Sequence, residues 1–327
     1  MQTSGLRFVL WVRWLILGLA VAVCASAHAA YPERPIVLVV PFAAGGGSDI
    51  VARTVARSMS DIAGLNIVVE NRPGAGGNIA SAAVAKARPD GYTILFMSTA
   101  THGINPSIYP NAGYDPIKDF TVIGQIGQGA MVLFAHAALP ASNLRELVAL
   151  VRQNPGKYAY GSPGSGTPHH LAMEQLKLKA GLSMAHVPYR GAGPGMADLA
   201  AGHIPLMIGG FGPAAAFITQ GKIKVIGSSN LSRLQSTKEV PLFSETVPGV
   251  GVGSWAGLAA PAGTPPEAIG VLGAALARAL ADGEVRQQLA RIGVDVDYQA
   301  AEPFARMIAN QLPVWKELVQ LSGAKAD

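Results

Sequence analysis

The sequence is poor in the residues that build reactive or highly charged surfaces. One of its 327 residues is cysteine, aromatic residues make up 6%, and charged residues make up 14%. Its net charge of +5 comes without a basic cluster, which disfavours nucleic-acid binding. Half of the residues are apolar, which excludes a disordered chain. The length is sufficient for two domains with buried cores.

Common catalytic motifs are also missing. The sequence has no G-x-S-x-G, G-x-G-x-x-G, G-x-x-x-x-G-K-[ST] or H-E-x-x-H pattern. The histidines beyond residue 30 show no i, i+4 pair and no neighbouring cysteine, which disfavours a zinc site; they are His102, His136, His169, His170, His186 and His203. We therefore expect no catalytic residue, no metal and no cofactor. A serine hydrolase stays an alternative, because catalytic triads are defined by geometry and not by motif.

The one long apolar run lies at the N-terminus. Residues 14–27 read WLILGLAVAVCASA, follow Arg13 and end at the small-residue site Ala27-His28-Ala29. This pattern predicts a secretory signal peptide over residues 1–29. The alternative is a retained anchor, but the run is shorter than the ~20 residues that a spanning helix needs. Cleavage after Ala29 would remove the only cysteine and two arginines, lowering the charge from +5 to +3. We expect a periplasmic protein without disulfides.

Beyond residue 30, strand-like and helix-like patterns alternate, which predicts an α/β fold with mostly parallel sheets. Ile36–Val40 is a β-branched run typical of a strand buried on both faces. Ser142 is expected to cap a helix, and Thr264–Glu267 to form a capping box. The C-terminal fifth is predicted to be helical, without strands of its own, kinked at Pro313 and packed on the first lobe. The other predicted strands are 66–70, 93–97, 158–160, 185–187, 206–208 and 224–227, and a helix is predicted over 78–86.

A strand, a glycine-rich turn and a helix start occur together twice. The segments are VVPFAAGGGSD at residues 39–49 and YAYGSPGSGTPHH at residues 158–170. In open α/β sheets, ligands bind beyond the carboxyl ends of the strands, where such turns lie. Two such turns in two halves of the chain indicate two lobes that face one cleft.

These turns suit an anionic ligand. Bare N–H groups at a helix start, together with the helix dipole, attract a carboxylate. Asp49 is expected to cap the helix or hold water, because a carboxylate would repel an anion. Ser98, Thr99 and Asn105 supply neutral donors after another strand. A structural role is the alternative for His170 and Tyr189, and Arg72 and Arg190 lie in Gly/Pro turns where solvent or carboxylates of the fold would pair them.

Several blocks, in order, resemble the Bug-type extracytoplasmic solute receptors of tripartite tricarboxylate transporters. They include YPERPIVLVVPFAAGGGSDIVAR, VVENRPGAGGNIA, NPSIYP, GSPGSGTPHHLA and HVPYRG. The likeness runs from Tyr31 to the C-terminal helix. It implies a two-lobed, type II periplasmic-binding-protein ("Venus flytrap") fold. Lobe 1 would comprise residues 30–130 and 254–327, and lobe 2 residues 131–253.

The resemblance also implies a site. The family typically holds a ligand carboxylate between the lobes with loop backbone, hydroxyl groups and two bridging waters. Gly209 and Gly210 stand where the family often has an aspartate, which favours a bulkier or more apolar carboxylate over an amino acid. The candidate ligand-binding residues are Phe42, Ala44, Gly46, Gly47, Ser48, Asp49, Ser98, Thr99, Asn105, Ser162, Gly164, Ser165, Gly166, Thr167, His170, Tyr189 and Gly209.

The function implied is that of a monomeric periplasmic receptor that delivers an organic carboxylate to the membrane subunits of such a transporter. One alternative is a periplasmic sensor that passes ligand status to a signalling partner. Another is a secreted hydrolase or lyase that uses His170 or His186. Turnover would separate the last reading from a receptor, since a receptor returns its ligand unaltered.

Overall fold

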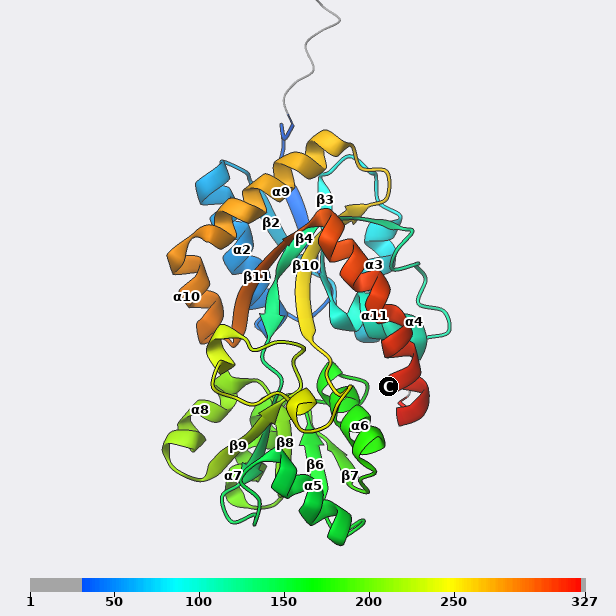
Figure 1. Cartoon of the computed structure of the whole chain (residues 1–327). Helices are drawn as coiled ribbons and strands as arrows, with labels where there is room; N and C mark the ends of the chain where they lie inside the picture. The colour runs from blue at the N-terminus through cyan, green and yellow to red at the C-terminus, as the bar shows by residue number, and fades with distance from the viewer. Residues whose placement is uncertain (1–30, 325–327) are drawn as a thin grey trace, which may run out of the picture. The chain divides into compact units, whose positions relative to one another are not determined.

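The computed structural model describes residues 31–324, and the strands of this range form two mixed β-sheets with helices on both faces (Figure 1). The predicted signal peptide lies outside the described residues. The first sheet has the strand order β11-β4-β10-β3-β1-β2, and the second has the order β7-β6-β8-β5-β9. The strands of the first sheet are β1 (Ile36–Val40), β2 (Ile67–Asn71), β3 (Thr93–Ser98), β4 (Phe120–Gly129), β10 (Ser254–Pro261) and β11 (Val294–Ala300). Those of the second are β5 (Val132–His136), β6 (Ala159–Ser162), β7 (Ala185–Pro188), β8 (Leu206–Gly209) and β9 (Ile223–Ser228).

The prediction of a two-lobed α/β fold is confirmed, but the sheets are mixed and not mostly parallel. Strand β1 pairs in parallel with β2 and β3, whereas β10 pairs antiparallel with β3 and β4. In the second sheet β6 pairs in parallel with β7 and β8, whereas β5 pairs antiparallel with β8 and β9. The chain leaves the first sheet along β4 and returns along β10, so these neighbouring strands run in opposite directions.

Each sheet buries side chains on both faces, as alternation along a strand requires. In the first sheet, Val39 and Leu95 pack with α3 and α11 on one face. Helices α2, α9 and α10 lie together on the other side (Figure 1). The helices of this lobe are α2 (Gly47–Ala63), α3 (Asn78–Ala85), α4 (Asn105–Ile108), α9 (Pro266–Ala281), α10 (Gly283–Arg291) and α11 (Ala301–Ser322), with a π-helical turn at Ala100–Ile104.

The second sheet follows the same plan. Leu133 and Ile208 face helices α5 and α6, while Val132 and Met207 face helices α7 and α8. These helices are α5 (Leu144–Gln153), α6 (Pro168–Ala180), α7 (Ala192–Ala201) and α8 (Phe211–Thr219). Short 3-10 turns at Gln235–Thr237 and Phe243–Glu245 lie in the connection that leads back to β10.

The C-terminal region departs from the sequence expectation in two ways. It contains strand β11, which pairs antiparallel with β4 at the edge of the first sheet. Helix α11 also does not pack on one lobe alone. Its Phe304 and Ile308 join the core of the first sheet, whereas Trp315 and Val319 lie in a cluster with residues of the second. The helix runs on through Pro313.

Two predicted helix caps are wrong. Asn143, and not Ser142, caps α5 by accepting a hydrogen bond of 3.0 Å from the Glu146 N–H. Helix α9 starts at Pro266 without a side-chain cap, and the Thr264 hydroxyl donates to the Pro261 carbonyl instead.

Within residues 31–324, no helix combines the length and the apolar character that crossing a membrane requires.

Candidate functional site

The first glycine-rich turn joins β1 to the N-terminus of α2. Gly46 is the extended N-cap residue, and Gly45 has a positive φ of 79° that favours glycine. The N–H groups of the first helical turn, including those of Gly47 and Ser48, have no acceptor within the helix. They lie at the positive end of a 17-residue helix.

Asp49 braces this turn from inside. The residue is 4% exposed, and its carboxylate accepts hydrogen bonds from the Gly45 N–H (2.8 Å), Asn71 Nδ2 (2.9 Å) and Arg53 Nε (3.1 Å). Burial alone would raise the pKa of Asp49, but the hydrogen bonds from Arg53, Gly45 and Asn71 outweigh it and lower that pKa. The carboxylate is thus ionised, and its oxygens accept hydrogen bonds from the loop backbone and from the Asn71 and Arg53 side chains.

A pocket of about 200 Å³ lies at the carboxyl end of β3, beside this turn. Its polar lining comes from Gly47, Ser48 and Ser98, and from Gly129 and Ser254, where the chain passes between the sheets. Among the described residues, no charged side chain lines it. The remaining lining residues are Val51, Phe96, Gly127, Trp255, Ala256, Ile292 and Val294. The pocket therefore combines neutral hydrogen-bond donors with an apolar wall.

Other predicted residues of the first lobe have structural partners. The Thr99 hydroxyl is buried and accepts a hydrogen bond of 2.8 Å from the Trp255 N–H. Asn105 donates to the Gly76 carbonyl at 2.9 Å and to Asn78 Oδ1 at 2.8 Å. The Phe42 carbonyl accepts from Asn71 Nδ2 at 3.0 Å, and Ala44 is exposed. These residues shape the turn and its surroundings, and they do not line the pocket.

The second glycine-rich turn joins β6 to α6. Thr167 caps α6 and donates from Oγ1 to the Gly164 carbonyl at 2.7 Å. Ser162 is fully buried, and its Oγ contacts the Gly164 carbonyl at 3.0 Å and His186 Nε2 at 2.7 Å. The Gly166 N–H donates to His170 Nδ1 at 3.1 Å, while Ser165 is exposed.

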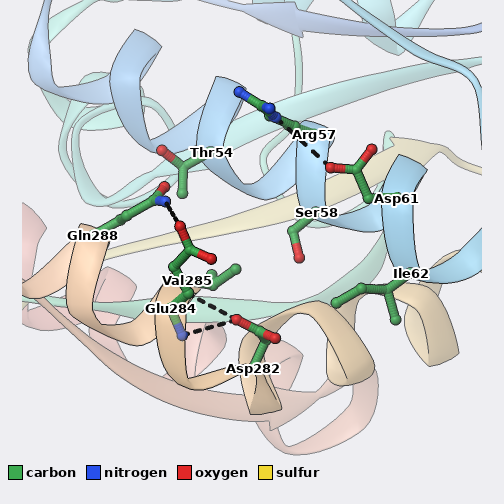
Figure 2. Close-up of a pocket in the computed structure, with 9 residues that line it drawn as sticks. All are labelled: Thr54, Arg57, Ser58, Asp61, Ile62, Asp282, Glu284, Val285 and Gln288. Carbon is green, nitrogen blue, oxygen red and sulfur yellow. Dashed lines mark hydrogen bonds and ion pairs between the residues drawn. The ribbon is translucent and has the colours of Figure 1, made fainter.

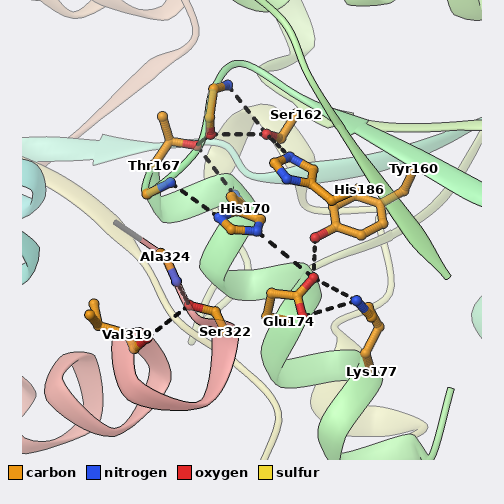
Figure 3. Close-up of polar contacts among 12 residues, drawn as sticks. Tyr160, Ser162, Thr167, His170, Glu174, Lys177, His186, Val319, Ser322 and Ala324 are labelled. Carbon is orange, nitrogen blue, oxygen red and sulfur yellow. Dashed lines mark hydrogen bonds and ion pairs between the residues drawn. The ribbon is translucent and has the colours of Figure 1, made fainter. Parts of the chain in front are cut away.

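A network of ring and charged side chains supports this turn from behind (Figure 3). The rings of His170 and His186 stack with centroids 3.9 Å apart. Glu174 accepts a short hydrogen bond from the Tyr160 hydroxyl and two bonds from Lys177 Nζ, at 2.8 and 3.0 Å. His170 Nε2 lies 3.8 Å from Glu174 Oε1. The contacts thus run from the Gly166 N–H through His170 to the Glu174–Lys177 ion pair, and they hold the turn in place.

Burial keeps both histidines neutral near pH 7. Burial, followed by the charge on His170, lowers the pKa of His186 to about 4. Burial also lowers the pKa of His170, although Glu174 opposes the shift. With Nδ1 of His170 accepting from Gly166, the ring proton of the neutral form lies on Nε2, toward Glu174.

The two remaining candidates, Tyr189 and Gly209, have structural surroundings of their own. The Tyr189 hydroxyl donates to Asp198 Oδ2 at 2.8 Å, although its backbone N–H pairs with the Ser162 carbonyl at 2.9 Å. Gly209 is buried within β8, where an added Cβ would lie 2.8 Å from Met196 Cε. An aspartate at position 209 would thus require Met196 to move.

Sequence reasoning missed the contributions of Gly129, Ser254 and Trp255 to the pocket, and those of Glu174 and Tyr160 to the second turn. No local pattern marks them. Gly129 and Ser254 meet because β4 and β10 pair, with these two residues in register. Glu174 carries a weak signal, since it follows His170 by one helical turn.

The fold and these turns define a class: a periplasmic binding protein of two α/β lobes. The sequence model of the "Tripartite tricarboxylate transporter family receptor" matches residues 51–324, and the chain belongs to this family.

Similar proteins agree with this assignment. Protein BugT of Bordetella pertussis is 30% identical over 99% of both chains. The structure of R. palustris Rpa4515 with adipate has a TM-score of 0.76 and 31% identity, covering 90% of this chain and 99% of the other. MatC from Rhodopseudomonas palustris with bound malate has a TM-score of 0.72 and 31% identity, covering 88% of this chain and all of the other.

Proposed function

We propose that this receptor captures an organic carboxylate between its two glycine-rich turns. The observation that carries the proposal is the pocket at the start of α2, where Gly47, Ser48 and Ser98 offer neutral donors and no lining side chain of residues 31–324 is charged. Adipate and malate, the ligands of two similar receptors, are both dicarboxylates. The apolar wall that includes Val51 and Phe96 favours a ligand with an apolar body, such as adipate.

The energy available from such donors is sufficient. A hydrogen bond to a charged group contributes about 1.5–3 kcal/mol, and a helix N-terminus about 0.3–1 kcal/mol, or up to ~2 kcal/mol when partly buried. A micromolar dissociation constant corresponds to about 8 kcal/mol. One turn supplies about half of this amount. Binding therefore favours a state in which both turns reach the ligand, and the ligand stabilises lobe closure through these additional contacts.

The second turn contributes through the exposed Ser165 hydroxyl and its remaining backbone groups. Ser162 and His170 are positioning residues in this proposal, because their polar atoms already serve the loop. Thr167 holds the Gly164 carbonyl and so fixes the loop backbone. Gly166 lies close to the first lobe, since a Cβ added to it would lie 2.8 Å from Cδ1 of Ile108 in α4.

The receptor would work in the periplasm after removal of residues 1–29, as a monomer that delivers its ligand to the membrane subunits of a tripartite tricarboxylate transporter. Its lobes would comprise residues 30–130 with 254–327, and residues 131–253. N-terminal sequencing of the exported protein tests the first point. A start at Ala30 is expected, and a start upstream of Ala27 would contradict it.

Calorimetric titration tests the ligand class. Adipate and malate would each be titrated into the mature protein, with dimethyl adipate as the neutral control. We expect saturable binding of at least one acid and none of the diester, because the ester lacks the negative headgroup. Equal binding of adipate and its diester, or no binding across a broad panel of acids by folded protein, would overturn the proposal.

A further inference from the structure

A second cavity, of about 310 Å³, lies between α2 and α10 (Figure 2). Its walls are formed by residues 54–62 of α2 and by residues 282–288, at the start of α10. In the described part of the chain it shares no lining residue with the pocket at the N-terminus of α2. Any ligand that it binds is therefore separate from the carboxylate proposed above.

Ser58 gives this cavity an unsatisfied polar group. The residue is 6% exposed, and its Oγ has no hydrogen-bond partner in the described part of the chain. Figure 2 shows the hydroxyl directed from α2 toward the start of α10. Serine within a helix commonly bonds back to the carbonyl four residues earlier. A buried hydroxyl without that bond costs stability unless a ligand completes it.

The charges around the hydroxyl are mainly negative. The lining includes three carboxylates, Asp61, Asp282 and Glu284, and one cation, Arg57. The Arg57 side chain is 86% exposed, and its Nε lies 3.7 Å from Asp61 Oδ2, so this pair is a weak one at the surface.

At the start of α10, Asp282 and Glu284 each accept local hydrogen bonds through one carboxylate oxygen. Asp282 caps α10 through Oδ1 alone, which accepts from the N–H groups of Glu284 (2.8 Å) and Val285 (3.0 Å). Glu284 accepts a bond of 3.1 Å from Gln288 through Oε1. The second oxygen of each carboxylate is not used in these bonds. The cavity is therefore an acidic site in a chain whose net charge is +5.

The composition of the cavity lining favours an organic cation over a metal ion. Among residues 31–324, no group of three or more histidine, cysteine, aspartate or glutamate side chains is arranged to hold a metal. Ile62 and Val285 add apolar wall to the same cavity. We propose that it binds an alkylammonium group, with the cation at Asp282, Glu284 and the Ser58 hydroxyl and the alkyl chain against Ile62 and Val285.

Calorimetry with two probes tests the site and its source of ligand. The probes are butane-1,4-diamine, a free amine, and Nα-acetyl-lysine amide, which presents a lysine side chain as a partner protein would. Butane-1,4-diol is the uncharged control. We expect saturable binding of at least one ammonium probe and none of the diol. Preference for the diamine would indicate a small-molecule ligand, and preference for the lysine derivative a protein partner.

Variants locate the binding. Glu284→Gln and Ser58→Ala should each weaken binding of the ammonium probe by at least about tenfold, which is the scale of one lost hydrogen bond to a charged group. Ser58→Ala should fold normally, because it removes only an unpaired hydroxyl. Glu317→Gln, an exposed charge change on α11 outside the cavity, should leave affinity unchanged. No saturable binding of either probe, equal binding of the diol, or wild-type affinity in both test variants would overturn the proposal.

Discussion

The two glycine-rich turns resemble each other in sequence but are braced by different chemistry. The first turn is held by the buried carboxylate of Asp49, which is paired with Arg53. The second is held by the neutral ring of His170, which stacks on His186. Both braces occupy a backbone N–H of their own loop and leave other donors at the helix start. Turns of similar sequence can thus rest on supports that respond differently to mutation and to pH.

Removing the charged brace should have the largest effect on stability. Asp49→Ala leaves the Gly45 N–H without its acceptor and removes one of the acceptors of Asn71 Nδ2 and of Arg53, which should lower the free energy of unfolding by about 3 kcal/mol. Urea denaturation at pH 7 measures it. Asp61→Ala, an exposed carboxylate on the same helix, should cost at most about 1 kcal/mol. Equal losses in the two variants would show that Asp49 does not brace the turn.

Removing the His170 side chain should lower the free energy of unfolding by less than removing the Asp49 carboxylate does. His170→Ala leaves the Gly166 N–H unpaired and a small cavity beside His186, which should lower the free energy of unfolding by about 2 kcal/mol. The matched control is His203→Ala, whose side chain is exposed. The affinity for the carboxylate should fall as well, because the loop loses its fixed backbone. Wild-type stability and affinity in this variant would show that His170 does not hold the second turn in place.

Acid should affect the two braces in different pH ranges. A histidine whose folded pKa is depressed stabilises the fold fully above its unfolded pKa, and this contribution is lost as pH falls through the folded value. For His186 the window runs from 6.5 down to about 4. The depressed pKa of Asp49 acts lower, with its contribution lost as pH falls below 3.8.

The corresponding measurement is the urea midpoint between pH 7 and pH 3. His186→Gln should flatten the fall between pH 6.5 and 4, and Asp49→Asn only the fall below that range. Because burial also lowers the pKa values of His102 and His169, His186→Gln should remove only part of the first fall. Identical pH profiles for the wild type and His186→Gln would contradict the histidine brace.

The sequence predicts the turns well, because glycine, a preceding β-branched strand and a following helix are local features. Strands β1, β3 and β8 and helix α3 agree with their predictions to within about one residue. The prediction that Asp49 caps the helix is wrong, because Gly46 is the N-cap residue of α2 and no side chain caps it; the Asp49 carboxylate instead accepts hydrogen bonds from Gly45, Asn71 and Arg53. The alternative of a structural role for Tyr189 matches its bond to Asp198.

The features that could not be predicted from the sequence depend on contacts between residues far apart in the chain. Strand β11 was missed because VDVDYQA is an edge strand that lacks the continuous apolar run of a buried one. The pocket residues Gly129 and Ser254 are 125 positions apart and meet only through the register of β4 and β10. The packing of α11 on both lobes follows from the positions of the lobes and from no feature of the helix alone.

The most direct test of the central claim is the affinity of Gly47→Asp beside Gly47→Ala. A Cβ at this position meets nothing within 4 Å, and an aspartate suits the first turn of a helix, so both variants should fold. Titration with whichever of adipate and malate binds wild type more tightly should show Gly47→Ala within about threefold of wild type and Gly47→Asp weakened at least about 100-fold, because its carboxylate repels the ligand's. Equal affinity of the two variants would mean that no negative headgroup binds at the start of α2.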